Sequence, residues 1–88
     1  MDDTEIEGAL RGFIVETILE GDDAGLDAST PLLEWGVIDS LAMVSLLDFI
    51  HRRFAVRIPD AEVLPRNFQT ISAIGRLVKR AAQEPGDG

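Results

Sequence analysis

The chain has 88 residues, a formal net charge of −8 and no cysteine. This length suffices for one domain with one core, and a hydrophobic fraction of 45% with 8 glycines and 4 prolines is typical of a globular protein. Without cysteine, a disulfide framework, a zinc finger and a thiol nucleophile are all excluded.

The distribution of charge argues against a nucleic-acid partner. Eleven of the 16 acidic residues precede Ser40, whereas seven of the eight basic residues follow it. Binding to phosphates needs a basic stripe that neutralises them. The cluster of His51, Arg52, Arg53 and Arg57 is small against this acidic background, so we interpret it as a solvated helix end.

No segment of the sequence has the features of a membrane span or a secretory signal. The start, Met1-Asp2-Asp3, is acidic where a signal peptide is basic. No apolar run reaches the roughly 18 residues of a membrane-spanning helix. We therefore expect a cytoplasmic protein with no membrane span.

The N-terminal region has the pattern of an amphipathic helix. Thr4 and Glu7 match the capping-box motif, so we expect the helix to begin there and to cover residues 5–20. Gly21 follows as a stop signal. The inward stripe at three- and four-residue spacing comprises Ile6, Ala9, Leu10, Phe13, Thr17 and Ile18.

Residues 21–38 are predicted to form a long, ordered loop. Apolar anchors such as Leu26, Leu32 and Trp35 interrupt its acidic residues and glycines. Loops of this length in small domains are often functional. The acidic residues from Glu20 to Asp27 lack the order of a calcium-binding loop, so we expect no metal site.

A second helix is predicted over residues 40–54, with Asp39 as its N-cap. At 100 degrees per residue, its core face comprises Met43, Leu46, Leu47, Ile50 and Phe54, with Phe49 at the border. Leu41, Val44 and Asp48 fall nearly opposite this stripe. A helix that buries only one side has no use for two aliphatic residues there, so we predict a contact surface.

The remainder predicts an all-α fold, a small four-helix bundle with three main helices and one short helix. Residues 55–58 are expected to be a loop, and a short helix should run from Pro59 to about Leu64 before Pro65 ends it. Thr70 is expected to cap the last helix. The inward residues of that helix are Ile71, Ile74, Leu77, Val78 and Ala81.

Enzymatic activity is not expected from this set of residues. The one histidine, His51, lies about three helical turns beyond Ser40, too far for a nucleophile and its base to share a hydrogen bond. A second histidine to complete a common metal cluster is lacking, and the glycines do not form a phosphate-binding loop.

Ser40 remains as the candidate functional residue. It opens the second helix, where free N–H groups and the positive end of the helix dipole would accommodate a phosphate on its hydroxyl. The tripeptide Asp39-Ser40-Leu41 alone is equally compatible with simple helix capping.

The wider context resembles the acyl carrier protein and peptidyl carrier protein superfamily. The resemblance rests on TPLLEWGVIDSL at residues 30–41, Leu46 and Leu47, Phe54, IPD at residues 58–60 and FQTI at residues 68–71. It extends from the first helix to about Val78. We expect a carrier domain over residues 1–82 and a flexible tail over residues 83–88.

By this resemblance, Ser40 would accept 4′-phosphopantetheine from coenzyme A through a phosphopantetheinyl transferase, and the thiol of the arm would carry cargo as a thioester. Asp39 would also help the transferase to hold its magnesium ion. Leu41, Val44 and Asp48 would meet partner enzymes. Trp35 would anchor the preceding loop by packing and expose part of its ring to a partner.

Departures from the family pattern narrow the function. Carriers of fatty acid synthesis have a strongly acidic second helix, whereas here Asp48 is its only acid and His51, Arg52 and Arg53 follow. We therefore expect a discrete, monomeric carrier in polyketide or nonribosomal peptide biosynthesis. An adenylating enzyme or acyltransferase would load it, and a downstream synthase would receive the cargo. The alternatives are a D-alanyl carrier and a noncovalent helical interaction module.

Overall fold

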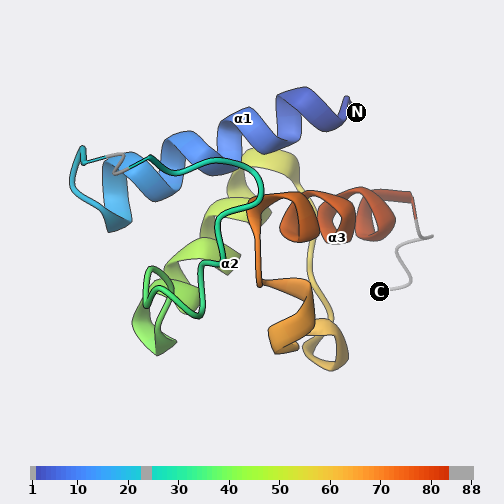
Figure 1. Cartoon of the computed structure of the whole chain (residues 1–88). Coiled ribbons are helices and arrows are strands. Elements are labelled where there is room, and N and C mark those ends of the chain that lie inside the picture. The colour runs from blue at the N-terminus through green and yellow to red at the C-terminus, as the bar shows by residue number, and fades with distance from the viewer. Residues whose placement is uncertain (1, 23–24, 84–88) are drawn as a thin grey trace.

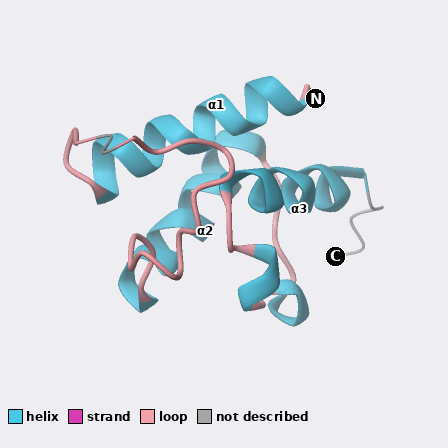
Figure 2. Ribbon diagram, in the orientation of Figure 1, coloured by secondary structure: helices cyan, strands magenta, loops and turns pink. Residues whose placement is uncertain are grey.

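The computed structural model describes residues 2–22 and 25–83. All regular structure in these ranges is helical (Figure 2), which confirms the predicted all-α bundle. Three α-helices form its body: α1 (Asp3–Phe13), α2 (Ser40–Phe54) and α3 (Ile71–Gln83). Short helical turns cover Ile14–Ile18, Asp60–Glu62 and Pro65–Asn67. None of the described helices is long and apolar enough to cross a membrane.

Helix α1 begins earlier than the sequence predicts. Asp2 is its N-cap, and the Asp2 carboxylate accepts a hydrogen bond from the Thr4 N–H at 3.1 Å. Thr4 and Glu7 both lie inside the helix, so the predicted capping box is wrong. Because Asp2 accepts from the Thr4 N–H, the helix starts at Asp3 and Thr4 is already part of it.

The end of this helix is a π-helical turn, Ile14–Ile18, which the sequence pattern did not predict. The Leu19 N–H donates to the Ile14 carbonyl at 2.9 Å, a five-residue spacing. Thr17, predicted in the apolar stripe, lies in this wider turn and is exposed, whereas Ile14, whose N–H still donates to the Leu10 carbonyl, is fully buried. The helical path ends at Ile18 rather than at residue 20, and Gly21 has the expected positive φ of 92°.

The core is built from one face of each helix and from apolar residues of the connecting segments. Figure 1 shows α1 lying along α3, its main packing partner, with α2 crossing beneath α1. On α2, Met43 and Leu47 were predicted to be core residues but are only half-buried at its edge. The buried residues are Ile6, Leu10, Ile14, Leu26, Leu32, Ile38, Leu46, Ile50, Phe54, Val56, Ile58, Phe68, Ile71, Ile74, Leu77 and Val78.

The long loop before α2 is fixed to the segment that begins α3. The Leu32 N–H donates to the Gln69 carbonyl at 2.7 Å, and the Ser72 N–H donates to the Ala28 carbonyl at 3.1 Å. Leu32 itself is fully buried. Because hydrogen bonds and a buried side chain hold it, the described part of the loop is ordered, as predicted, and it enters α2 from a fixed position.

The C-terminal third differs from the prediction in its short elements. The single helix expected after Pro59 is replaced by two 3-10 turns, Asp60–Glu62 and Pro65–Asn67. Pro65 begins the second turn instead of ending the first, because proline suits the first helical position. Thr70 caps α3 as predicted, accepting from the Ala73 N–H at 3.0 Å. Gln83 is the last residue of α3, and the rest of the predicted tail lies outside the described residues.

Candidate functional site

Ser40 is the first residue of α2, and it is exposed to solvent. Asp39 precedes it in an extended conformation, and the Asp39 Oδ1 accepts from the Ala42 N–H at 2.8 Å. The Asp39 carbonyl accepts from the Met43 N–H, also at 2.8 Å. The predicted cap is therefore confirmed, and it places the serine hydroxyl at the open end of the helix.

The backbone at this helix end is suited to an anion. Within the described residues, nothing accepts a hydrogen bond from the N–H groups of Ser40 and Leu41. The helix macrodipole places about half a positive charge at this end, and the first turn contains no acidic residue. A phosphate ester on the Ser40 hydroxyl would meet donors and a favourable field, so the site fits a phosphate-linked group.

Three large apolar side chains near Ser40 are unusually exposed. The exposed fraction is 80% for Leu41, 66% for Val44 and 58% for Trp35. Asp48 lies on the same side of α2 as Leu41 and Val44 and pairs with Arg52 at 3.1 Å. This exposure agrees with the face isolated from helical periodicity. Trp35 is mostly in solvent, so its predicted packing role is at most partial, and the partner role of all four residues stays a prediction.

Other chemistry is not assembled around the serine. His51 is exposed on the last turn of α2, well away from Ser40 along the helix. The described part of the chain contains no cluster of three or more residues able to ligate a metal ion.

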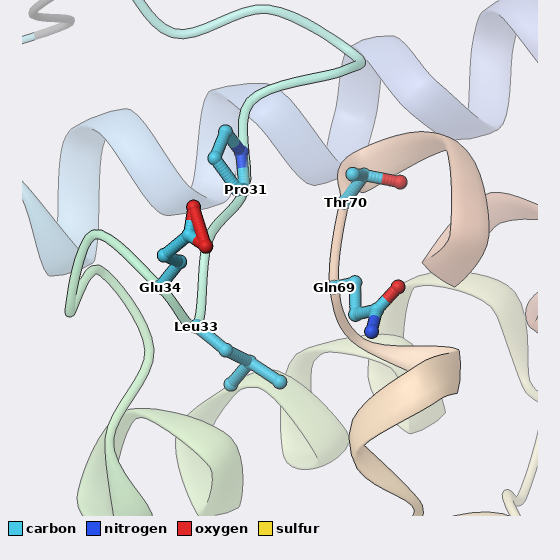
Figure 3. Close-up of a pocket in the computed structure, with 5 residues that line it drawn as sticks. All are labelled: Pro31, Leu33, Glu34, Gln69 and Thr70. Carbon is cyan, nitrogen blue, oxygen red and sulfur yellow. The ribbon is translucent and has the colours of Figure 1, made fainter.

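Two cavities lie near the loop that leads to α2. Figure 3 shows the first, about 350 Å³, where the loop meets the segment before α3. It is lined by Pro31, Leu33, Glu34, Gln69 and Thr70, and Ser40 is not among these residues. The second, also about 350 Å³, is an open groove whose lining includes both sequence neighbours of Ser40, Asp39 and Leu41. Sequence reasoning missed this groove, because one wall of it comes from the π turn.

Comparison with known proteins decides the family. The sequence pattern of the family described as "Phosphopantetheine attachment site" matches residues 13–78. The chain belongs to this family. The carrier is 36% identical over 83 residues to the probable acyl carrier protein PigG of Serratia sp. (strain ATCC 39006), an alignment that covers 94% of this chain and 95% of PigG.

A solved structure gives a similar result for the fold. One chain of a structure reported as the crystal structure of an FAD-dependent dehydrogenase matches the carrier with a TM-score of 0.75 and 40% sequence identity. The match covers 78% of the carrier and 97% of that chain. The carrier therefore shares its fold with a solved chain of similar sequence.

Membership confirms the two central predictions, the carrier function and the cofactor. Proteins of this family hold 4′-phosphopantetheine covalently and present the groups bound to it, and they are typically not catalysts themselves. The chain is therefore a phosphopantetheine carrier protein. Such carriers generally work with phosphopantetheinyl transferases and synthase enzymes.

Proposed function

We propose that Ser40 is the attachment residue and that the carrier passes acyl or aminoacyl groups between enzymes as thioesters on the arm. The observation that supports this most directly is the geometry of Ser40. Its hydroxyl is exposed at the first position of α2, beside two backbone N–H groups without an acceptor among the described residues.

The reacting atom that this chain supplies for the modification is the hydroxyl oxygen of Ser40. The Ser40 Oγ attacks the phosphorus of coenzyme A that bears the pantetheine, and a new O–P bond forms. The phosphoanhydride bond breaks, adenosine 3′,5′-bisphosphate leaves, and the hydroxyl proton passes to a base of the transferase. Asp39 uses Oδ1 for the cap, which leaves Oδ2 to face the magnesium ion of the transferase.

We assign the carrier to polyketide or nonribosomal peptide biosynthesis, with an adenylating enzyme or acyltransferase as its loading partner. The charge of α2 supports this, because its one acid, Asp48, is already paired with Arg52. The similarity to the acyl carrier protein PigG supports a discrete carrier. A cytoplasmic location goes with this assignment, since coenzyme A and the transferase must reach Ser40.

The structure reported as an FAD-dependent dehydrogenase suggests one class of downstream partner. We propose that the downstream partners of the carrier include a flavin-dependent dehydrogenase. This enzyme would oxidise the thioester-bound group while its FAD takes up two electrons. Incubation of the loaded carrier with such an enzyme should lower the mass of the cargo by two hydrogens. An unchanged mass would remove this class of partner.

The attachment residue can be tested by intact mass. The purified protein, mixed with coenzyme A and a permissive phosphopantetheinyl transferase, should gain the mass of one phosphopantetheine. Ser40→Ala should gain nothing, whereas Ser45→Ala, which alters another exposed serine of α2, should be modified as the wild type is. No gain in the wild type, or a gain in Ser40→Ala, would refute the assignment.

A noncovalent interaction module remains the second candidate function. The observation that favours it is the exposure of Leu41 and Val44, which could bind a partner without any arm. Equal affinity of the unmodified and modified proteins for a partner enzyme would support it. A D-alanyl carrier would share the chemistry of Ser40 and differ only in cargo, so the intact mass of the protein from its native host distinguishes it.

A further inference from the structure

We propose that a groove between α1 and the last turns of α2 is a second docking surface. It binds a partner protein that inserts one large apolar side chain flanked by a basic and an acidic residue. This α1–α2 groove has a volume of about 360 Å³. Its walls include Ala9, Gly12, Phe13 and Glu16 from α1 and the π turn, and Phe49 and Arg53 from α2.

Two phenylalanine rings connect the walls of the α1–α2 groove. Phe13, the last residue of α1, stacks on Phe49 with the ring centroids 4.4 Å apart and the ring planes 17° apart. Phe49 also meets the Phe54 ring edge to face at 6.1 Å. Phe13 and Phe49 pack against the core but are only partly buried. The groove therefore presents aromatic surface held in place by ring contacts, and aromatic residues are enriched at the centres of protein interfaces.

Opposite charges flank this aromatic surface without meeting each other. Glu16 lies on the side of the π turn and Arg53 on the side of α2, and both are exposed. Within the described residues, neither side chain forms an ion pair. The Arg53 guanidinium lies 5.4 Å from the centroid of the Phe54 ring. A partner with a base opposite Glu16, an acid opposite Arg53 and an apolar residue between them would complement all of these features.

Gly12 leaves space in the wall that α1 contributes. Glycine inside a helix costs roughly 0.5–1 kcal/mol relative to alanine. A Cβ atom at residue 12 would meet nothing within 4 Å, so no close contact in the described part of the chain requires glycine there. Its φ is not positive either. The absent side chain therefore serves to keep the groove open, and a larger residue at this position would project into it.

The α1–α2 groove lies on a different side of α2 from the serine. Phe49 follows Ser40 by nine residues, which at 100 degrees per residue places the two half a turn apart around the helix. At 1.5 Å per residue they are also about 14 Å apart along its axis. Leu41 and Val44 do not line the groove. A protein bound there can therefore hold the carrier in place while enzymes take turns at Ser40.

The test uses helical peptides selected by phage display on the full-length carrier. The selected peptides should combine a large apolar residue with a base and an acid on one face, and fluorescence anisotropy measures their affinity. Gly12→Leu fills the groove and should weaken binding about tenfold or more, as loss of an anchor contact does. Gly8→Leu is the matched control and should bind as the wild type does. Gly8 is also a glycine of α1 with no atom within 4 Å of a Cβ, and it does not line the groove.

Reversal of the two charges tests the chemistry of the partner. Glu16→Lys and Arg53→Glu should each weaken the selected peptide by up to about fivefold, the range of one exposed ion pair. A peptide with the opposing charge reversed should recover this loss in the matching variant. If reversal in the peptide restores nothing, the proposed charge complementarity is refuted.

Further controls separate this surface from the serine and its neighbours. Thermal unfolding checks that every variant is folded, and saturating peptide should leave the rate of phosphopantetheine transfer to Ser40 unchanged. Slower transfer would show that the two sides of α2 are not independent. The α1–α2 groove is overturned as a docking surface if no such peptide is enriched, if Gly12→Leu binds as the wild type does, or if all selected peptides lose binding in Leu41→Asp.

The α1–α2 groove and the attachment at Ser40 fail separately. Ser40→Ala should bind the selected peptides with wild-type affinity, because the groove does not include the serine. A carrier that gains no mass from coenzyme A would refute the attachment alone. Peptide binding that is lost in Ser40→Ala would refute the docking surface alone.

Discussion

Replacing Asp39 in two ways separates its structural role from its proposed role in modification. Asp39→Asn keeps a side-chain oxygen that can accept from the Ala42 N–H, the 2.8 Å bond seen here, but removes the charge. Asp39→Ala removes both. Asparagine and aspartate are nearly equal as N-caps, so only the alanine variant should lose the cap.

The expected size of the effect follows from capping energetics. Loss of a side-chain N-cap costs about 0.5–2 kcal/mol, typically about 1 kcal/mol. In a domain of this size, 1 kcal/mol lowers Tm by about 4–8 °C. Thermal unfolding followed by circular dichroism should therefore show Asp39→Ala clearly below the wild type and Asp39→Asn close to it. Modification by the transferase should slow in both variants, because both lack the carboxylate.

Two different results would contradict these expectations. Equal destabilisation of the two variants would show that charge at the helix end, and not the hydrogen bond to Ala42, makes the contribution. A wild-type modification rate in Asp39→Asn would refute the role of the carboxylate in holding the transferase's magnesium ion. That second result would leave Ser40 as the attachment residue.

Three further predictions follow from the helices. Ala55, the C-cap of α2, has a left-handed conformation with φ 56°, so Ala55→Gly should raise the free energy of unfolding by about 1 kcal/mol; a lower Tm would contradict this. Leu46→Ala, at a fully buried site, should lower the free energy of unfolding by about 2–5 kcal/mol, whereas Leu41→Ala on the exposed face should change it by at most about 0.5 kcal/mol. Urea denaturation measures both changes, and equal losses of stability would refute the assigned faces. Val44→Asp should slow cargo transfer to a partner enzyme with unchanged Tm, and an unchanged transfer rate would remove Val44 from the partner face.

The parts of the fold that the sequence predicts well depend on short-range signals. Asp39 and Thr70 each place an oxygen within reach of an N–H three residues later, and both caps occur as predicted. The exposed position of Leu41 and Val44 follows from periodicity along a regular helix. Because Ser40 directly follows a strong cap, its place at the helix start could be read from three residues.

The parts that were missed depend on choices between nearly equal local alternatives. Asp2 and Thr4 are both good N-caps, and the sequence alone does not rank them. The π turn keeps a helical path but changes the hydrogen-bond spacing from four residues to five, and Thr17, which lies within it, is exposed. A sequence pattern with a fixed period of 3.6 residues does not reveal such a change in spacing. The groove beside Ser40 was missed for the same reason.

The two backbone hydrogen bonds from the long loop to Gln69 and Ser72 tie the serine's approach to the C-terminal third of the chain. A nascent chain in which only α1 and α2 have formed still lacks the hydrogen-bond partners that hold this loop in place. Incomplete or partly unfolded molecules should therefore be modified more slowly than the folded carrier. Coenzyme A would then be consumed mainly by carriers that are able to deliver cargo. The start of the last helix therefore influences how the serine at the start of α2 is presented.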